Sequence, residues 1–209
     1  MAKGSGGTRS STSGSPKGLQ APAVPEPAPM ASAINKIKKA ELRWIELVQS
    51  GEVDKLSDDD YRKAHDAIYD ARRSPLSIDS KYSQAEADAL TYYAGHIGYE
   101  NINRGLNGQR KLSAEDKDAI AKIDKAMQKT KLKKDTVVFR GIDQEDSGTW
   151  KGYVSTSRAV YDADKFRNDT KHLHAYLIPK GTPVAYIYGA GEDEYLLPRG
   201  FNLKKYRIK

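Results

Sequence analysis

Glu192-Asp193-Glu194-Tyr195-Leu196-Leu197-Pro198-Arg199-Gly200 is the most informative stretch of this sequence. Side chains alternate between the two faces of an extended chain, so Glu192 and Glu194 would point into the same site. Two carboxylates in one site can divide their work: one stabilises a developing positive charge, and the other moves a proton or orients a nucleophile. An acidic turn before an apolar strand would carry the same residues, so the stretch needs support from other parts of the chain.

Two earlier stretches supply polar groups that fit such a site. The first is Phe139-Arg140-Gly141, where an arginine ends an apolar strand and a glycine lets the backbone approach a ligand, which suits phosphate binding. The second is Gly152-Tyr153-Val154-Ser155-Thr156-Ser157, in which Ser155 and Ser157 share one face and could orient a carboxylate or a ribose. A solvated arginine and an exposed edge strand would account for each stretch taken alone.

Taken in order, the three stretches resemble the Arg–Ser–Glu class of mono-ADP-ribosyltransferases. This class includes the C3-like exoenzymes, the actin-modifying binary toxins and bacteriophage-encoded transferases. Tyr93-Ala94-Gly95, with Tyr99 and Ile102-Asn103 after it, resembles the helix that precedes the arginine strand in those toxins. Leu177-Ile178-Pro179-Lys180-Gly181-Thr182 resembles the strand and turn before the glutamates. The resemblance covers about residues 93 to 209.

The resemblance implies an α+β fold of two small, roughly perpendicular β-sheets flanked by helices, with NAD bound as a substrate in the cleft between them. It also implies roles for four residues. Arg140 would bind the NAD phosphates, and Ser155 would hydrogen-bond to Glu194. Glu194 would contact the ribose hydroxyl and stabilise the cation that forms when nicotinamide leaves. Glu192 would orient or deprotonate the acceptor.

The remaining cofactor contacts follow from the same resemblance. The backbone of Gly141 would lie against the nicotinamide amide, and the aromatic ring that stacks on nicotinamide would be Phe166, beside Arg167, or else Tyr161. The predicted cofactor-binding set is Asn103, Arg140, Gly141, Ser155, Thr156, Ser157, Phe166 and Arg167.

The chain departs from the family pattern at one position. The toxins usually have Leu-Arg after the Ile-Asn helix motif, whereas this chain has Leu106-Asn107. Either Arg104 or Arg110 would replace the missing arginine at the cofactor phosphates, or the affinity for NAD would be lower.

The expected activity is transfer of ADP-ribose from NAD to an acceptor. A glutamate at position 192, two residues before Glu194, goes with arginine modification in this family, so we expect an arginine on a target protein. The alternatives are an NAD glycohydrolase, a transferase that acts on RNA or DNA, and a non-enzymatic nucleic-acid-binding or virion-associated module. A toxin-like bacterial or bacteriophage effector fits the family.

Composition limits the other possibilities. The 209 residues contain no cysteine, which excludes disulfides, thiolate metal ligands and a cysteine nucleophile. His172 and His174 lack a third nearby ligand, so no metal is expected. No apolar run reaches the roughly 20 residues of a membrane span, and no secretory signal begins the chain. The net charge of +7 attracts polyanions. We expect a cytoplasmic monomer without membrane contacts.

The spacing of apolar, glycine and proline residues along the sequence predicts helices first and strands later. Residues 1–30 are expected to be a disordered tail, and 31–209 the catalytic domain, with a helical part over 31–80 and a core over 81–209. Helices are predicted from about 34 to 48, from Ser57, from the Ser83/Glu86 capping box to about 93, over 99–106 and from Ser113. Strands are predicted over 136–139, 152–157, 172–178, 183–188, 195–197 and 201–208.

Overall fold

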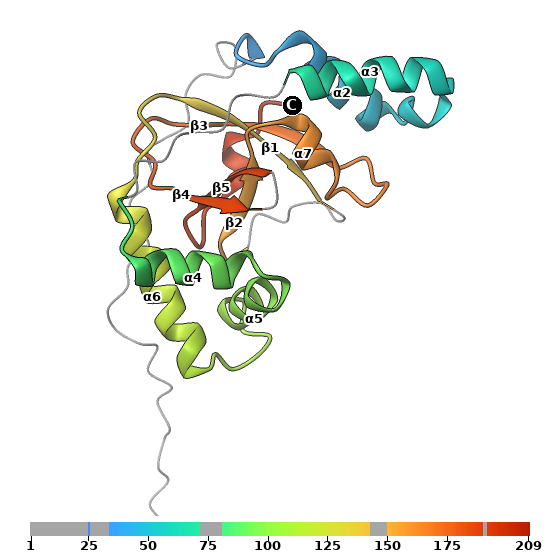
Figure 1. Ribbon diagram of the computed structural model, residues 1–209. Coiled ribbons are helices and arrows are strands. Elements are labelled where there is room, and N and C mark those ends of the chain that lie inside the picture. Colours follow the sequence, from blue (N-terminus) through green and yellow to red (C-terminus); the bar gives the residue numbers. More distant parts are fainter. Residues whose placement is uncertain (1–24, 26–33, 72–80, 143–149, 190–191) are drawn as a thin grey trace, which may run out of the picture.

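The computed structural model describes residues 25, 34–71, 81–142, 150–189 and 192–209. All α-helices but one come first along the described chain and the strands follow, with the short α7 between β2 and β3 (Figure 1). Apart from Pro25, the predicted tail lies outside the described residues. The elements in order are α2 Lys39–Ser50, 3-10 helix η1 Val53–Lys55, α3 Asp58–Asp70, α4 Gln84–Ala94, α5 His96–Leu106, α6 Ala114–Lys129, β1 Thr136–Gly141, β2 Val154–Ser157, α7 Val160–Asp164, β3 Leu173–Ile178, β4 Ala185–Gly189, β5 Glu192–Leu197 and 3-10 helix η2 Leu203–Tyr206.

The polar residues that begin the helices were correctly identified. The hydroxyls of Ser57, Ser83 and Ser113 each accept a hydrogen bond from the backbone three residues later, as N-caps do. Gly51 ends α2 in the left-handed conformation, with φ of 74°. Gly98 lies inside α5. A Cβ there would come within 1.9 Å of the Tyr92 carbonyl oxygen, so close packing rather than helix breaking accounts for this glycine.

The strands form one antiparallel sheet with the order β3-β1-β2-β5-β4. β1 pairs with β3 over its whole length, and β2 pairs with β5 likewise. In contrast, β1 and β2 share a single register pair, Phe139 with Ser157. The α+β class and the helical N-terminal portion are therefore confirmed, and the two predicted sheets correspond to two halves of one sheet, β3-β1 and β2-β5-β4, that meet at this one pair.

Three hydrophobic cores fill the layers of the fold. The first lies between α2, α3 and α7 and one face of the β3-β1 half; it contains Trp44, Ile45, Phe139 and Leu173. The second lies between α4, α5 and α6 and the β4-β5 half. The third lies between the two halves of the sheet, where Val138 and Tyr176 meet Tyr195 and other side chains of β2, β4 and β5. Because Val138 and Phe139 are adjacent on β1, their side chains enter different cores on opposite faces of the strand.

The predicted strand over residues 201–208 is wrong. Leu203 and Tyr206, three positions apart, are buried on one side of the 3-10 helix η2, and only Arg207 makes an isolated bridge, to Tyr176. A spacing of three matches the turn of a 3-10 helix, so the apolar residues fit it better than the period of two of a strand. No helix within the described ranges is long and apolar enough to cross a membrane.

Asp124 on α6 joins the second core to the end of β5. Its carboxylate accepts hydrogen bonds from the Tyr153 hydroxyl at 2.7 Å and from Arg199 Nε at 2.9 Å. Asp124→Ala would take the carboxylate partner from the partly buried Arg199 guanidinium and leave the buried Tyr153 hydroxyl with only the longer bond to the Ile120 carbonyl, at 3.2 Å, so we expect the free energy of unfolding to fall by about 2 kcal/mol. Urea denaturation measures this change. Asp118→Ala on the exposed side of the same helix should cost less than about 0.5 kcal/mol, and equal losses for both variants would contradict the assignment.

Two buried capping carboxylates should make stability depend on pH. The hydrogen bond from Lys129 and the one from the Ser83 backbone hold the pKa of Glu86 below its ordinary value of 4.5. Burial pushes the pKa of Asp116 upward, but hydrogen bonds from Ser113 and Tyr92 outweigh it, and the pKa lies below 3.8. Carboxylates with lowered pKa values stabilise the folded state above their unfolded pKa, and that contribution is lost as the pH falls through the folded value.

We therefore expect the urea midpoint to stay level down to about pH 5 and to drop below it. Glu86→Gln should lower the midpoint at pH 7 and flatten the acid limb, whereas Asp66→Asn on exposed α3 should leave the profile unchanged. An acid limb that is equally steep in Glu86→Gln would show that this carboxylate does not carry the effect.

Candidate active site

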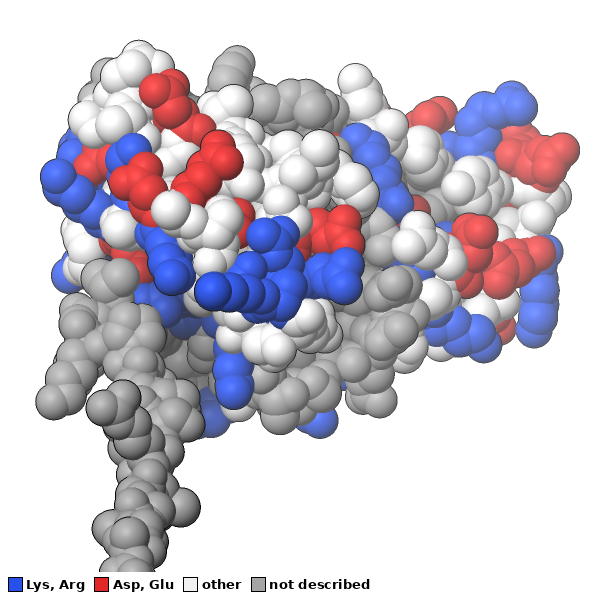
Figure 2. All heavy atoms as spheres, turned by 90° about the horizontal axis from the view of Figure 1, so that it is seen from below, with Lys and Arg blue, Asp and Glu red and all other residues white. Residues whose placement is uncertain are grey.

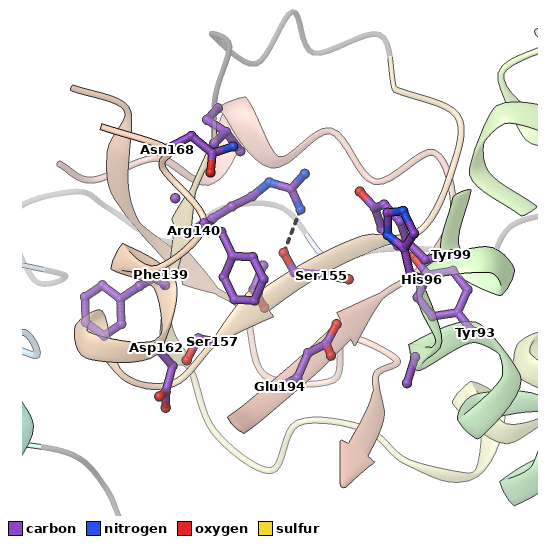
Figure 3. Close-up of a pocket in the computed structure, with 16 residues that line it drawn as sticks. Tyr93, His96, Tyr99, Phe139, Arg140, Ser155, Ser157, Asp162, Asn168 and Glu194 are labelled. Atoms are coloured by element: carbon purple, nitrogen blue, oxygen red, sulfur yellow. Dashed lines mark hydrogen bonds between the residues drawn. The ribbon is translucent and has the colours of Figure 1, made fainter. Parts of the chain in front are cut away.

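A cavity of about 640 Å³ opens at the junction of the two sheet halves. Its walls come from segments far apart in the sequence: the end of α4 with the start of α5, the end of β1, β2, α7 with the loop after it, and β5 (Figure 3). The lining residues are Tyr93, Ala94, His96, Tyr99, Phe139, Arg140, Gly141, Ile142, Ser155, Thr156, Ser157, Asp162, Ala163, Phe166, Asn168 and Glu194.

Arg140 spans the place where the strands separate. Arg140 lies on β1, opposite His174 of β3 and one residue beyond the single β1–β2 pair. Its Nη1 donates a hydrogen bond to the Ser155 carbonyl at 2.6 Å. Figure 3 shows this bond beside the open space of the cavity. A guanidinium carries five N–H donors in one plane, so holding Ser155 with one of them leaves donors for an anionic ligand.

Gly141 is fixed by close packing against α7. A Cβ at this position would lie 2.2 Å from the Ala163 carbonyl oxygen and 3.0 Å from the Arg167 backbone nitrogen. The end of β1 and the end of α7 can approach this closely only where the strand lacks a side chain. The contact holds α7, and with it Phe166, against the cavity.

Glu194 belongs to the same face of the sheet as Ser157, its partner across β2 and β5. Its other cross-strand partner is Ile187 on β4. Figure 3 shows Glu194, Ser155 and Arg140 around the same space. Cross-strand partners lie side by side on one face. The pairing of β2 with β5 therefore fixes the distance between the serine hydroxyls of β2 and the carboxylate of Glu194.

Behind these residues lies a buried polar network centred on Tyr93. Asn103 donates from Nδ2 to the Tyr93 hydroxyl at 2.9 Å and accepts from the Tyr153 backbone N–H at 3.0 Å. Tyr93 and Ser155 line the same cavity. Burial raises the pKa of Tyr93 far above its ordinary value, and the hydrogen bond from Asn103 opposes this only in part, so the phenol stays neutral near Glu194.

The structure brings together most of the predicted site residues. Arg140, Gly141, Phe166 and Glu194 line the cavity, as does the hydroxyl run from Ser155 to Ser157. Within that run, the Thr156 hydroxyl donates to the Tyr195 carbonyl and the Ser157 hydroxyl accepts from the Ala159 backbone.

Two predicted cofactor contacts lie elsewhere. Asn103 is buried beneath the wall, where it holds Tyr93. Arg167 is not among the residues that line the cavity; its Nε donates to Asp164 at 2.7 Å and its Nη1 donates to the Thr170 carbonyl at 2.9 Å. Arginine and asparagine side chains have many donors to satisfy when buried, and neighbouring backbone and carboxylate groups satisfy them here.

The structure also shows where the alternative candidates for the stacking ring and the missing arginine lie. Phe166 lines the cavity and is half exposed, whereas Tyr161 packs against the rings of His65 and Tyr69. Arg104 pairs with Glu100 on its own helix, and Arg110 pairs with Asp116, so neither reaches the cavity.

Glu192 is described only in its backbone. It pairs with Gly189 across β4 and β5, and its side chain lies outside the described residues.

Sequence reasoning missed the wall formed by α7 and the start of α5. Asp162 is fully buried and forms an ion pair with Lys165 at 3.1 Å. His96 and Asn168 line the cavity from opposite sides. Five residues are too few for helical periodicity to identify α7; the one local signal is Ser157, whose hydroxyl accepts the Ala159 N–H just before the helix. Within the described ranges, no three His, Asp or Glu side chains are grouped to hold a metal ion.

Comparison with known proteins agrees with the sequence motifs. Residues 58–149 match the family model of the ADP-ribosyltransferase exoenzymes, a segment that includes Arg140 and covers less than half of the chain. This match confirms the family resemblance that the motifs predict. None of the curated proteins compared with the chain matches it.

Several solved structures are similar. The C3 exoenzyme of Clostridium limosum matches at 22% identity and a TM-score of 0.48, over 68% of this chain and 82% of that one. Plx2a, an ADP-ribosyltransferase toxin from Paenibacillus larvae, matches at 26% identity and a TM-score of 0.48, over 65% and 83%. Exoenzyme S from Pseudomonas aeruginosa, in complex with human 14-3-3 protein beta and bound to Carba-NAD, matches at 22% identity and a TM-score of 0.48, over 67% and 77%.

The close contact between Gly141 on β1 and Ala163 on α7 can be tested by substitution. Gly141→Ala forces a methyl group against the Ala163 carbonyl, so α7 must shift, and we expect the free energy of unfolding to fall by about 2 kcal/mol. Urea denaturation measures the loss. A variant as stable as the wild-type chain would mean that β1 and α7 are farther apart than the structure has them.

Proposed function

We propose that this chain is an NAD-dependent mono-ADP-ribosyltransferase that transfers ADP-ribose to an arginine of a target protein. The observation that carries the proposal is the single cavity in which Arg140, Ser155 and Glu194 meet, three residues from three different strands. The exoenzyme family match over residues 58–149 supports the same chemistry.

Arg140 binds the NAD phosphates in this proposal. Its guanidinium is anchored on the Ser155 carbonyl, so its remaining donors have a fixed direction. An anchored planar fork loses less side-chain entropy on binding a phosphate than a flexible lysine would. Phe166, half exposed in the same cavity, offers its ring to the nicotinamide.

Glu194 stabilises the reacting sugar. When the bond between ribose C1′ and the nicotinamide nitrogen breaks, the electron pair leaves with nicotinamide and positive charge develops on the ribose. A carboxylate already fixed beside that charge lowers the barrier without having to reorganise. Glu194 is held for this role by its place on β5 between β2 and β4, and the Ser155 backbone is held by Arg140.

The proposal that the acceptor is an arginine rests on Glu192. Its backbone lies two positions before Glu194 on β5, and alternate residues of a strand share a face. A second carboxylate on that face can orient the guanidinium of the acceptor and take the proton that it loses when its nitrogen attacks C1′.

The test is incubation of the purified chain with labelled NAD and a cell lysate, beside Glu194→Gln. We expect the wild-type chain to consume NAD and label protein, and Glu194→Gln to lose at least about 100-fold in turnover because the cation loses its counter-charge. Asp118→Asn, on the exposed side of α6, is the control and should retain full activity. If the wild-type chain leaves NAD intact with every lysate, the proposed activity is wrong.

The nature of the labelled product decides the acceptor. Label that neutral hydroxylamine removes from protein at the rate of an arginine linkage supports the proposal. Label on RNA or DNA would replace the arginine acceptor by a nucleic acid. Free ADP-ribose as the sole product would make the chain an NAD glycohydrolase.

A further inference from the structure

A group of lysines gathers at the end of β1 that lies away from the cavity. There the connection between α6 and β1 runs beside the turn between β3 and β4 (Figure 1). The Leu132 N–H donates to the Thr182 carbonyl at 3.0 Å, and the Gly181 N–H donates to the Leu132 carbonyl at 2.8 Å. These bonds place two lysine-bearing segments side by side, together with a third from the start of the described chain. The lysines, named here the lysine surface, are Lys36, Lys131, Lys133, Lys134 and Lys180.

One carboxylate, Asp135, lies among these lysines. Its Oδ2 accepts from Lys36 Nζ at 3.3 Å, and its Oδ1 accepts from the Lys180 backbone N–H at 2.9 Å. The backbone bond from Lys180, together with the charge of Lys36, holds the pKa of Asp135 below its ordinary value, as expected in a positive environment. Asp135 therefore already has its partners.

The other lysines keep their charge for a ligand. All members of the lysine surface are exposed, and only Lys36 forms an ion pair with a described carboxylate. Two further exposed lysines, Lys204 and Lys205, lie on η2, which packs against β3 next to this turn. Like charges gathered on neighbouring segments repel one another, and a polyanion relieves the repulsion.

This arrangement differs from the face that carries α4, α5 and α6. Figure 2 shows acidic side chains beside the basic ones on that face, so the charges there compensate in part. At the lysine surface, five lysines face one carboxylate. The net charge of +7 is thus unevenly distributed over the molecule.

We propose that the lysine surface binds the phosphate backbone of nucleic acid. Lysine ammonium groups act as mobile point charges that suit phosphates spaced along a strand, and contacts to phosphates carry no base recognition. A membrane surface would also need apolar side chains that insert, and among the exposed large hydrophobic residues of the described chain only Ile34 lies in these segments.

Binding at this surface is separate from the proposed catalysis. The cavity is lined by the last residues of β1 and the residue after it, Phe139 to Ile142, whereas the lysines precede the first residue of that strand, Thr136. A nucleic acid bound here is therefore held away from Glu194. The surface would localise the enzyme at nucleic acid or at proteins bound to it.

The test measures binding of the full chain to a fluorescein-labelled 20-base-pair DNA duplex by fluorescence anisotropy between 50 and 200 mM salt. The first variant changes Lys131, Lys133, Lys134 and Lys180 to Gln. The control changes four exposed lysines elsewhere, Lys55, Lys111, Lys117 and Lys125, to Gln, so both variants carry the same net charge. NAD turnover and thermal midpoint, measured on both, confirm that they fold.

We expect the first variant to bind at least about tenfold more weakly at 100 mM salt, with the slope of log K against log salt reduced by about 3. The control should lose less than about threefold, and NAD turnover should be equal in all three proteins. Equal losses in the two variants would overturn the proposal, because binding would then follow net charge alone. No binding of the wild-type chain at 50 mM salt would also overturn it, as would binding to phosphatidylserine vesicles without binding to DNA.

Discussion

The fold depends on how β1 meets β2. Adjacent antiparallel strands usually pair along their length, but these two share only the pair of Phe139 with Ser157 before they separate. The separation leaves backbone groups of β2 without a partner strand, and a buried carbonyl needs a donor. Arg140 supplies one to Ser155. A single side chain therefore completes the junction between the two halves of the sheet and stands at the edge of the space that their separation opens.

The rest of the structure keeps that space at a fixed size. The two halves pack against each other through Val138, Tyr176 and Tyr195, while the helices before β1 cover their outer faces. α7 is pressed onto the end of β1 at Gly141, which brings Phe166 to the rim. On the other side, Asn103 holds Tyr93 in the wall of the cavity. Glu194 thus faces a cavity whose walls belong to two separately packed cores, which suits a preorganised electrostatic site.

The sequence predicts the parts of this arrangement that local chemistry determines. Ser57, Ser83 and Ser113 indicate where helices begin, because a hydroxyl just before a helix accepts a hydrogen bond from a backbone N–H of its first turn. β1, β3 and β4 appear as short apolar runs, whereas only the apolar half of β5, from Tyr195 to Leu197, is predicted. The order of the arginine, serine and glutamate motifs points to the family resemblance. The motifs also predict that Arg140, Ser155 and Glu194 lie in one site, because the activity implied by the resemblance needs all three residues together. Their strands must therefore be neighbours.

What the sequence does not show depends on tertiary contacts. Asn103 and Arg167 have side chains suited to a cofactor, but their donors are satisfied by Tyr93 and Asp164, and only the packed structure reveals these partners. The Leu203–Tyr206 segment carries apolar residues that suit a strand or a 3-10 helix, and the pairing partner decides between them. The lysine surface is similarly invisible in sequence because Lys36, Lys134 and Lys180 come from three distant segments.

The most direct test of the central claim is a crystal structure of the Glu194→Gln variant with NAD, in which cleavage is blocked and binding is retained. The account predicts the pyrophosphate within hydrogen-bonding distance of the Arg140 guanidinium, the nicotinamide ribose beside position 194, and the nicotinamide ring against Phe166. Electron density for NAD outside the cavity between the two sheet halves, or a pyrophosphate bound without Arg140, would contradict it.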